Sequence, residues 1–305
     1  MRRYFDRAPD RALLGVGDDC AMLRPNAGLE LALTTDMLVE GRHFAAGVDA
    51  RSIGHKSLAV NLSDLAAMGA APRWALLAIG LPSADAGWVE NFAAGFFSLA
   101  ERHGVELIGG DTTRSALRTI SITAIGELPS GVALYRSAAR AGDDIWVSGE
   151  LGGAALALRH PDIAEAKKRL DWPEPRVELG ERLRGLARAA IDVSDGLAGD
   201  LGHIVERSQV AAVVEYERIP RSSVFQSLGD AELERACILS GGDDYELVFT
   251  APATRRDAIM ALGRELGLPL TRIGAIEAGE PRVVVRDAKG EPIAHGGGYD
   301  HFRQP

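Results

Sequence analysis

The sequence predicts a mixed α/β protein made of two domains. Short apolar runs that end at Gly, Asp or Pro alternate with longer stretches in which apolar residues recur at helical spacing, as in α/β folds. Turn-forming residues at 129–131 interrupt this alternation before a new strand begins. We therefore expect an N-terminal α/β domain over residues 1–133 and a C-terminal α+β domain over residues 134–305. With 305 residues, 46% of them hydrophobic, the chain can fill two cores.

Four strands and two helices are expected in the first domain. Leu31 and Leu33 alternate with other residues in the first strand, and an almost continuous apolar run forms the second. The expected strands are 30–35, 74–81, 105–108 and 119–126, and the expected helices are 52–68 and 85–103.

The second domain repeats this alternation of strands and helices. Pro173 and Pro175 lie in the segment 163–176, which we interpret as a linker because proline disrupts helices. The expected strands are 144–148, 211–216, 246–250 and 282–286, and the expected helices are 151–159, 197–207 and 254–266.

Composition excludes several classes of protein. The formal charge of −9 argues against a general nucleic-acid binder, which would carry a basic face. The two cysteines, Cys20 and Cys237, are too few and too far apart for a disulfide framework or a CxxC metal site. No apolar run is long enough to cross a bilayer, and the N-terminus has no signal-like apolar region. We expect a cytoplasmic protein with no membrane partner.

Aspartates recur beside Gly, Ser or Thr where apolar runs end. Carboxylates that converge without matching Lys or Arg repel one another and lose solvation, so a cluster of them normally needs cations. This pattern indicates Mg²⁺ and phosphate chemistry. The examples are Gly17-Asp18, Thr35-Asp36, Ser63-Asp64, Gly110-Asp111, Asp192, Ser194-Asp195 and Gly242-Asp243.

Two of these motifs belong to the first strand and the first helix. Asn61 and Asp64 are three residues apart, so they lie on one helix face and can address the same site. The segment Thr34-Thr35-Asp36 follows the first strand and offers the oxygen ligands that Mg²⁺ prefers. The alternatives are a solvated helix face for Asp64 and a turn-capping role for Asp36.

The next two motifs combine carboxylates with backbone groups suited to phosphate. Gly109 and Gly110 close a strand and permit close approach of a phosphate, with Asp111 available to a metal. The segment 192–196 opens a helix, where carboxylates and free N–H groups can act together. Helix capping is the alternative for this segment. By contrast, 142–144 directly precedes a strand and is interpreted as a turn without a functional role.

Familiar nucleotide motifs are missing. The sequence has no GxxxxGK[ST] loop, and the segment beginning at Gly15 fails as a dinucleotide fingerprint because Cys20 replaces the third glycine. An ATP site in this chain is therefore expected to be bridged by metal ions.

Taken in chain order, the motifs resemble those of the thiamine-monophosphate kinase family, within the superfamily of aminoimidazole ribonucleotide synthetase and selenophosphate synthetase. The resemblance covers nearly the whole chain. The matching segments are GVGDDCAML at 15–23, TTDMLVEGRHF at 34–44, GHKSLAVNLSDLAAMGA at 54–70, IGGDTTRS at 108–115, AIDVSDGLAGDLGHI at 190–204, SGGDDYELVFT at 240–250 and GYDHF at 298–302.

The resemblance implies roles for individual residues. The catalytic set is Asp36, Asp64, Asp111 and Asp195. The implied Mg²⁺ ligands are Asp18, Thr34, Thr35, Asp36, Asp64, Asp111, Asp192 and Asp195. The residues implied to contact ATP are Gly110, Asp111, Arg136 and Ser194. The residues implied to face thiamine monophosphate are His43, Asp243 and Tyr299.

The resemblance also implies an activity and an assembly. The activity is in-line transfer of the γ-phosphoryl group of ATP to thiamine monophosphate, the last step of thiamine diphosphate synthesis, with several Mg²⁺ ions. The assembly is a homodimer in which two N-terminal domains share a barrel. The chain departs from the family pattern at Asp243, where Glu is common, and in having fewer residues before 2–5.

Two other functions are compatible with the same motifs. Another enzyme of the superfamily would use ATP to activate a carbonyl oxygen, while selenophosphate synthesis is disfavoured because neither cysteine lies in a glycine-rich N-terminal loop. A non-catalytic nucleotide or divalent-ion sensor would keep the carboxylates without turnover.

Overall fold

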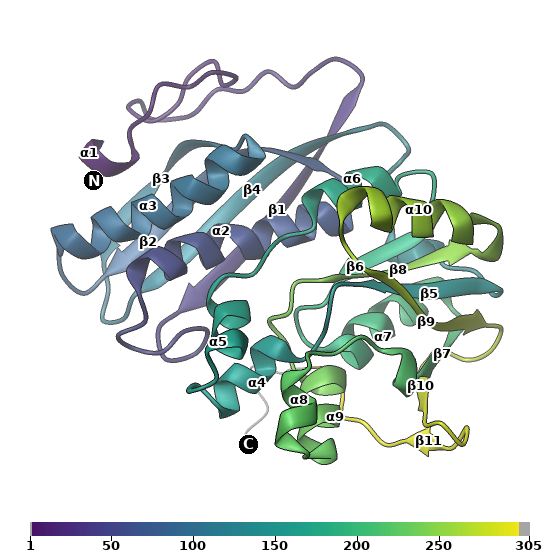
Figure 1. The fold of residues 1–305 in the computed structure, drawn as a ribbon. Helices are drawn as coiled ribbons and strands as arrows, with labels where there is room; N and C mark the ends of the chain where they lie inside the picture. Colours follow the sequence, from purple (N-terminus) through teal and green to yellow (C-terminus); the bar gives the residue numbers. More distant parts are fainter. Residues whose placement is uncertain (1, 299–305) are drawn as a thin grey trace. The chain divides into compact units, whose positions relative to one another are not determined.

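The computed structural model describes residues 2–298, whose contacts form two compact units (Figure 1). The first unit contains the chain up to Leu65 together with Ala70–Ala133. The second contains Ala66–Gly69 and the chain from Leu134 onward. Each unit has its own β-sheet with helices packed on it, which confirms the predicted mixed α/β class.

The first unit is a four-stranded sheet in the order β1-β4-β2-β3. β2 and β3 are parallel, and the other neighbours are antiparallel. The helices α2 and α3 cover one face of this sheet (Figure 1). The elements are α1 (Arg2–Phe5), β1 (Leu29–Val39), α2 (Ala50–Ala67), β2 (Ala71–Leu81), α3 (Ala86–His103), β3 (Glu106–Arg114) and β4 (Thr119–Pro129).

Local signals explain the two long helices. The carboxylate of Asp85 accepts a hydrogen bond from the N–H of Trp88 at 3.1 Å and so caps the start of α3, while Gly104 ends it in the left-handed conformation. In α2, Ser57, Asn61 and Ser63 are buried together with the leucines, and Asn61 has no exposed surface, whereas Asp64 is half-buried. The buried polar residues of α2 must therefore find partners inside the protein.

The opposite face of the four-stranded sheet is only partly covered. Ala12 packs with Trp74 and Ile125, so the N-terminal segment lies over the middle of this face. On the edge strand β1, Leu33 is 63% exposed, and Leu31 and Met37 are exposed beside it. An apolar edge of this kind is unusual in a sheet that stands alone.

The second unit is a seven-stranded sheet in the order β11-β10-β7-β9-β5-β8-β6. Its strands are β5 (Asp143–Ser148), β6 (Ala189–Asp192), β7 (Ala211–Glu215), β8 (Leu247–Pro252), β9 (Leu270–Glu277), β10 (Arg282–Arg286) and β11 (Pro292–Ile293). Its helices are η1 (Arg136–Ala138), α4 (Gly153–Arg159), α5 (Ala164–Asp171), α6 (Val177–Leu183), α7 (Leu197–Ser208), η2 (Tyr216–Arg218), α8 (Val224–Leu228), α9 (Ala231–Ser240), η3 (Ala253–Arg255) and α10 (Arg256–Leu266).

The structure corrects several sequence-based assignments. The segment 163–176 is not a simple linker, because it contains α5, which is supported by an ion pair between Lys167 and Asp171 one turn apart. Strands β1 and β3 also continue past their aspartates, so the motifs at 34–36 and 109–111 lie inside strands. The sequence analysis missed the strands β6, β9 and β11 and the helices α6, α8 and α9.

A turn at 141–142 leads into β5, as predicted, but Asp143 and Asp144 are already the first residues of the strand. Gly142 has φ +91°, and the carboxylate of Asp144 accepts hydrogen bonds from the side chains of Arg256 and Arg272 at 2.5–2.7 Å. These arginines lower the pKa of Asp144 although burial opposes them. Both aspartates at the start of β5 are held by structural ion pairs, because Asp143 also pairs with Arg188 at 3.0 Å.

Candidate active site

Three predicted site residues meet between β1 and α2. Thr34 and Asp36 are two residues apart on β1 and therefore point to the same face of the sheet, which is the face that α2 covers. The hydroxyl of Thr34 donates a hydrogen bond to Asp64, and the backbone N–H of Asp36 donates to Asn61 Oδ1 at 3.1 Å. Asn61 is itself fixed by donating to the carbonyl of Ser57 at 3.0 Å. Two carboxylates and a hydroxyl are thus collected at one sheet edge, and we call Thr34, Asp36 and Asp64 the β1–α2 group.

Thr35 and His43 lie nearby but are oriented differently. Thr35 points to the other sheet face, where its hydroxyl contacts the hydroxyl of Thr123 on β4. His43 lies in the turn after β1, and its Nδ1 accepts a hydrogen bond from the N–H of Val39 at 3.0 Å. This bond places the ring proton of a neutral His43 on Nε2.

Gly110 and Asp111 lie on β3, at the opposite edge of the same sheet. Gly110 has φ +146°, and a Cβ there would be 1.8 Å from the carbonyl oxygen of Leu77, so only glycine allows β3 to pass β2 this closely. Asp111 is exposed, and it lines a small cavity of about 140 Å³ together with Val16. Asp18, also exposed, follows Val16 by two residues.

The strand order separates these two sets of carboxylates. Three strand spacings lie between β1 and β3, which corresponds to roughly 14 Å. Among residues 2–298, no group of three His, Cys, Asp or Glu side chains is placed to hold a metal ion. The convergence of all eight predicted ligands therefore stays a prediction, although their oxygen donors suit Mg²⁺.

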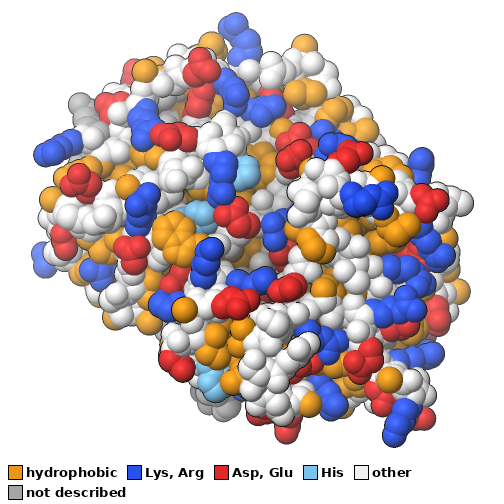
Figure 2. Space-filling model, in the orientation of Figure 1, with side chains coloured by type: hydrophobic (Ala, Val, Ile, Leu, Met, Phe, Trp, Pro, Cys, Tyr) orange, Lys and Arg blue, Asp and Glu red, His pale blue; other side chains and the backbone are white. Residues whose placement is uncertain are grey.

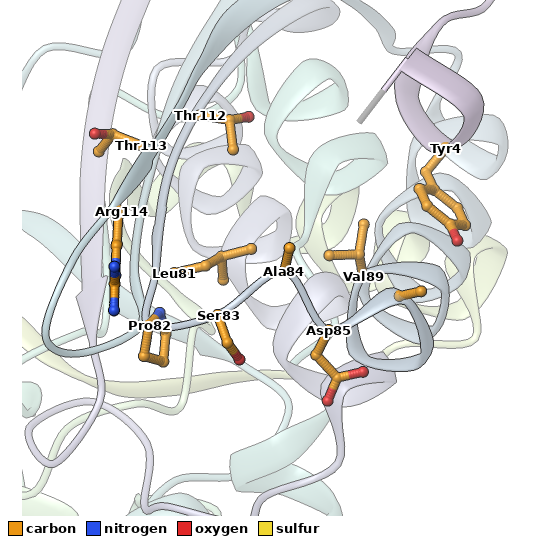
Figure 3. A pocket seen from close by; sticks show the side chains of 11 residues that line it. Tyr4, Leu81, Pro82, Ser83, Ala84, Asp85, Val89, Thr112, Thr113 and Arg114 are labelled. Atoms are coloured by element: carbon orange, nitrogen blue, oxygen red, sulfur yellow. The ribbon is translucent and has the colours of Figure 1, made fainter.

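A larger pocket is lined on one side by Thr112, Thr113 and Arg114, which follow Asp111 on β3 (Figure 3). Thr112 lines both this pocket and the small cavity, and Arg114 continues the wall along β3. Tyr4, Val89 and the loop 81–86 provide the remaining walls (Figure 3). Its volume of about 650 Å³ falls within the range of small-molecule sites.

In the second unit, the loop after β6 is held by a residue that the sequence analysis missed. Asp192, the last residue of β6, is buried. The carboxylate of Asp200 accepts hydrogen bonds from the backbone N–H groups of Ser194 and Asp195, both at 3.0 Å. Burial raises the pKa of Asp200 to about 7, helped by the charge of Asp195 and opposed by the two N–H donors. In the sequence, this role of Asp200 was indicated by its position as a carboxylate in the first turn of the helix that begins at Leu197.

The loop before β8 packs directly against this one. A Cβ on Gly242 would be 2.1 Å from the carbonyl oxygen of Ser194, and the N–H of Asp243 donates to that oxygen at 2.9 Å. Asp243 has φ +70°, and its carboxylate accepts a hydrogen bond from the hydroxyl of Tyr245 at 3.0 Å. Ser194 and Asp243 are thereby held together, whereas Tyr299 lies outside the described residues.

Arg136 lies on the same side of the second unit. Its carbonyl oxygen, in η1, accepts a hydrogen bond from the hydroxyl of Ser208 at the end of α7, at 2.8 Å. Its positive charge lowers the pKa of Asp200. The predicted ATP residues Arg136 and Ser194 thus belong to one region of this unit.

Two further carboxylates support the loop that carries Asp243. Asp244 accepts hydrogen bonds from the N–H groups of Gly152 and Ala154 at the start of α4, at 2.7 and 3.3 Å. Glu246 accepts from the hydroxyl of Ser148 at 2.5 Å and from Nε of Arg176 at 2.7 Å. These contacts are structural, because both carboxylates are used by groups of the fold.

Charges of both signs are mixed on the face of the molecule that Figure 2 shows. Acidic and basic side chains are interspersed across the face in Figure 2. Within residues 2–298, no helix has the length and apolar character needed to cross a membrane. Both cysteines are free thiols, with Cys20 exposed and Cys237 buried.

Comparison with known proteins identifies the family. Residues 17–128 match the AIR synthase related protein N-terminal domain, and residues 140–286 match the corresponding C-terminal domain. Thiamine-monophosphate kinase of Escherichia coli K12 is 44% identical over 321 residues, covering 100% of this chain and 98% of that protein. The chain belongs to the thiamine-monophosphate kinase family. The resemblance inferred from the motifs is thereby confirmed.

Solved structures of this family share the fold. The crystal structure of thiamine-monophosphate kinase from Stenotrophomonas maltophilia K279a is 50% identical, has a TM-score of 0.87 and covers 93% of both chains. The structure of AaThiL complexed with AMPPCP and TMP is 32% identical and has a TM-score of 0.79, covering 92% of this chain and 89% of that chain.

Proposed function

We propose that this chain transfers the γ-phosphoryl group of ATP to thiamine monophosphate and releases thiamine diphosphate and ADP. The observation that carries this proposal is the full-length match to a thiamine-monophosphate kinase, with 44% identity over 100% of the chain. AaThiL, which shares the fold, was solved with AMPPCP and TMP. AMPPCP stands for ATP with a methylene in place of the β–γ bridging oxygen, so it occupies a nucleotide site without donating its phosphoryl group.

The reaction requires positioning more than proton transfer. The phosphate of thiamine monophosphate is ionised near neutral pH, so its oxygen can attack the γ-phosphorus in line without a strong general base. Gly110 lets the backbone of β3 lie close to its neighbours, and Asp200 fixes the N–H groups of Ser194 and Asp195. We assign ATP contacts to Gly110, Asp111, Arg136 and Ser194, with the pocket beside Thr112 available to the nucleoside.

The implied Mg²⁺ ions fit the donors of this chain, which are carboxylate and hydroxyl oxygens. Bound Mg²⁺ would neutralise the crowded phosphate oxygens and the charge that develops during transfer. The β1–α2 group already gathers Thr34, Asp36 and Asp64 through the hydrogen bonds described above. The proposed ligands are Asp18, Thr34, Thr35, Asp36, Asp64, Asp111, Asp192 and Asp195.

We assign the thiamine phosphate to the residues near His43, Asp243 and Tyr299. The hydrogen bond at Nδ1 orients the His43 ring so that Nε2 carries its proton, a donor suited to a phosphate oxygen. Asp243 has the left-handed backbone conformation, so its carboxylate points in a different direction from that of a residue in extended backbone. A carboxylate there can accept a hydrogen bond from an amino group of the thiamine ring.

The enzyme is proposed to work as a homodimer in the cytoplasm. The exposed leucines of β1 form an apolar edge that a second copy would cover, so that two four-stranded sheets close into one barrel. The cytoplasmic assignment rests on the two free cysteines, which suit a reducing compartment.

The proposal is tested by identifying the product. Purified protein is incubated with ATP, Mg²⁺ and thiamine monophosphate, and the mixture is separated by chromatography. We expect thiamine diphosphate and ADP in equal amounts, and neither product when Mg²⁺ is chelated. ADP and free phosphate without thiamine diphosphate would favour another ATP-dependent enzyme of the superfamily, and binding without turnover would favour a sensor.

A further inference from the structure

The carboxylate of Glu106, at the start of β3, accepts hydrogen bonds from three consecutive backbone N–H groups. Its Oε1 accepts from Asp10 at 3.2 Å and from Arg11 at 2.6 Å, and its Oε2 accepts from Ala12 at 3.0 Å. Hydrogen bonds from backbone N–H groups that converge on one carboxylate are charge-assisted and therefore strong. This contact fixes the backbone of residues 10–12 against β3.

The chain after residue 12 forms a loop whose two ends are bonded to each other. The N–H of Leu14 donates to the carbonyl oxygen of Met22 at 3.2 Å, and the N–H of Met22 donates back to the carbonyl oxygen of Leu14 at 2.9 Å. Ala12 before this pair and Leu23 after it pack on the same apolar cluster of the first unit. The loop 15–21 is therefore attached to the sheet at both ends, and Glu106 holds the segment that leads into it.

The same loop reaches the part of β3 that carries Asp111. Val16 lines the small cavity beside Gly110 and Asp111. Asp18 follows Val16 by two residues, and its Oδ1 accepts a hydrogen bond from the N–H of Asp19 at 2.9 Å. One strand thus carries Asp111 and, through Glu106 at its start, anchors the loop that carries Asp18.

A second carboxylate contacts the N-terminal segment in a different way. Glu101, on α3, pairs with Arg7 at 2.6 Å, and the two side chains are 66% and 49% exposed. Ion pairs with this exposure contribute little to stability. Because Arg7 precedes residues 10–12, this pair provides a control with the same charge that does not hold the loop.

We propose that Glu106 is a positioning residue that holds the loop 15–21, and with it Asp18, beside Asp111. Glu106 does not line the cavity and acts through residues 10–12. The seating of the loop follows from these contacts, whereas the use of Asp18 and Asp111 for Mg²⁺ rests on the proposed function. Residues that orient metal ligands affect metal affinity without contacting the ion, so loosening the loop should weaken Mg²⁺ binding.

Thiamine diphosphate formation, measured across Mg²⁺ concentrations with the intact protein, tests this role. Glu106→Ala removes all three acceptor contacts, and we expect the half-maximal Mg²⁺ concentration to rise about tenfold while the rate at saturating Mg²⁺ stays within about threefold of wild type. Glu106→Gln keeps one oxygen but turns an NH₂ group toward a backbone N–H, so its rise should be smaller. Glu101→Gln should stay within about twofold of wild type. A loss of rate that saturating Mg²⁺ does not restore, or an equal shift in Glu101→Gln, would overturn the proposal.

A double variant tests whether Glu106 acts through Asp18. In Asp18→Asn the loop no longer offers that charge, so adding Glu106→Ala should change the half-maximal Mg²⁺ concentration by less than about twofold. An equal rise in the wild-type and Asp18→Asn backgrounds would show that the two residues act independently, which contradicts the proposal.

Hydrogen exchange measured without substrates or metal reads the seating of the loop independently of activity. The N–H groups of Leu14 and Met22 bond to each other's carbonyl oxygens and not to Glu106. Faster exchange of both in Glu106→Ala, but not in Glu101→Gln, would support the proposal, and unchanged exchange would overturn it. If Glu106→Ala fails to fold, Glu106→Gln decides by the same criteria. A wild type that makes no thiamine diphosphate would refute the proposed function, while the exchange result would still decide whether Glu106 seats the loop.

Discussion

Replacing Asp64 with asparagine removes one of the two negative charges of the β1–α2 group and leaves a side chain of nearly the same size and shape. The hydroxyl of Thr34 donates to Asp64 Oδ2, and an asparagine oxygen can accept the same hydrogen bond. The substitution also relieves repulsion between Asp36 and Asp64, so the protein without metal should be no less stable. The variant therefore separates loss of metal-binding charge from loss of fold.

The expected loss of activity follows from the charge. At an effective dielectric constant of about 20, a unit charge about 4 Å from a divalent ion contributes about 8 kcal/mol before hydration is restored. In the variant, water that hydrates the ion compensates for most of this Coulomb energy. We therefore expect a net loss of transition-state stabilisation of about 2.7 kcal/mol or more, which is about 100-fold or more in kcat/KM. Raising the Mg²⁺ concentration should recover part of the loss.

The assay measures thiamine diphosphate formation across a range of Mg²⁺ concentrations. Asp230→Asn is the matched control, because Asp230 caps α9 by accepting hydrogen bonds from the N–H groups of Glu232 and Leu233, and asparagine caps equally well. It changes the net charge by the same amount and should keep activity within about twofold of wild type. Near-normal kinetics of Asp64→Asn at every Mg²⁺ concentration, or an equal loss in Asp230→Asn, would refute the reasoning.

Three further outcomes are expected. Gly110→Ala should destabilise the protein by about 1–3 kcal/mol or more in urea unfolding and raise KM for ATP, because φ is +146° and the new Cβ would meet the carbonyl of Leu77. Gly109→Ala is the control for stability, because a Cβ there would meet only the side chain of Leu76 at 3.2 Å, and an equal loss of stability in both variants would contradict the claim. The stability of the wild type should fall as pH rises from about 4 to 7, because burial raises the pKa of Asp244 to about 7 and the folded state then holds a proton that the unfolded state releases. Asp244→Asn should flatten this slope in urea unfolding, and an unchanged slope would assign the dependence to other groups. Leu33→Glu should convert the dimer into a monomer in analytical sedimentation, because it places a charge on the exposed apolar edge of β1. A wild type that is monomeric and fully active at micromolar concentration would contradict the proposed dimer.

Local sequence patterns predicted most helices of the first unit and the side-by-side placement of Asn61 and Asp64. Residues three apart on a helix share a face whatever surrounds it, so this inference needed no tertiary information. The ends of strands were less predictable. β1 was expected to end before Asp36 but continues to Val39, because its pairing with β4 runs without interruption from Leu29 to Val39.

Helix α5 is a second element that the local sequence pattern did not predict correctly. Pro161, Pro173 and Pro175 indicated a linker over 163–176, yet residues between Pro161 and Pro173 form a helix with Ala166 buried against the core of the second unit. Proline restricts its immediate neighbours and says little about a turn of helix several residues away.

The sequence by itself determined the chemistry of this protein: which oxygen donors recur, which glycines accompany them, and in what order along the chain. Tertiary structure decided which of them meet. It placed Asp36 and Asp111 at opposite edges of one sheet, because strand order depends on long-range pairing that local patterns do not encode. It also buried Asp200 beneath the backbone of Ser194 and laid Gly298 across Gly199, since close contacts between distant segments arise only when the packed elements bring their backbones together.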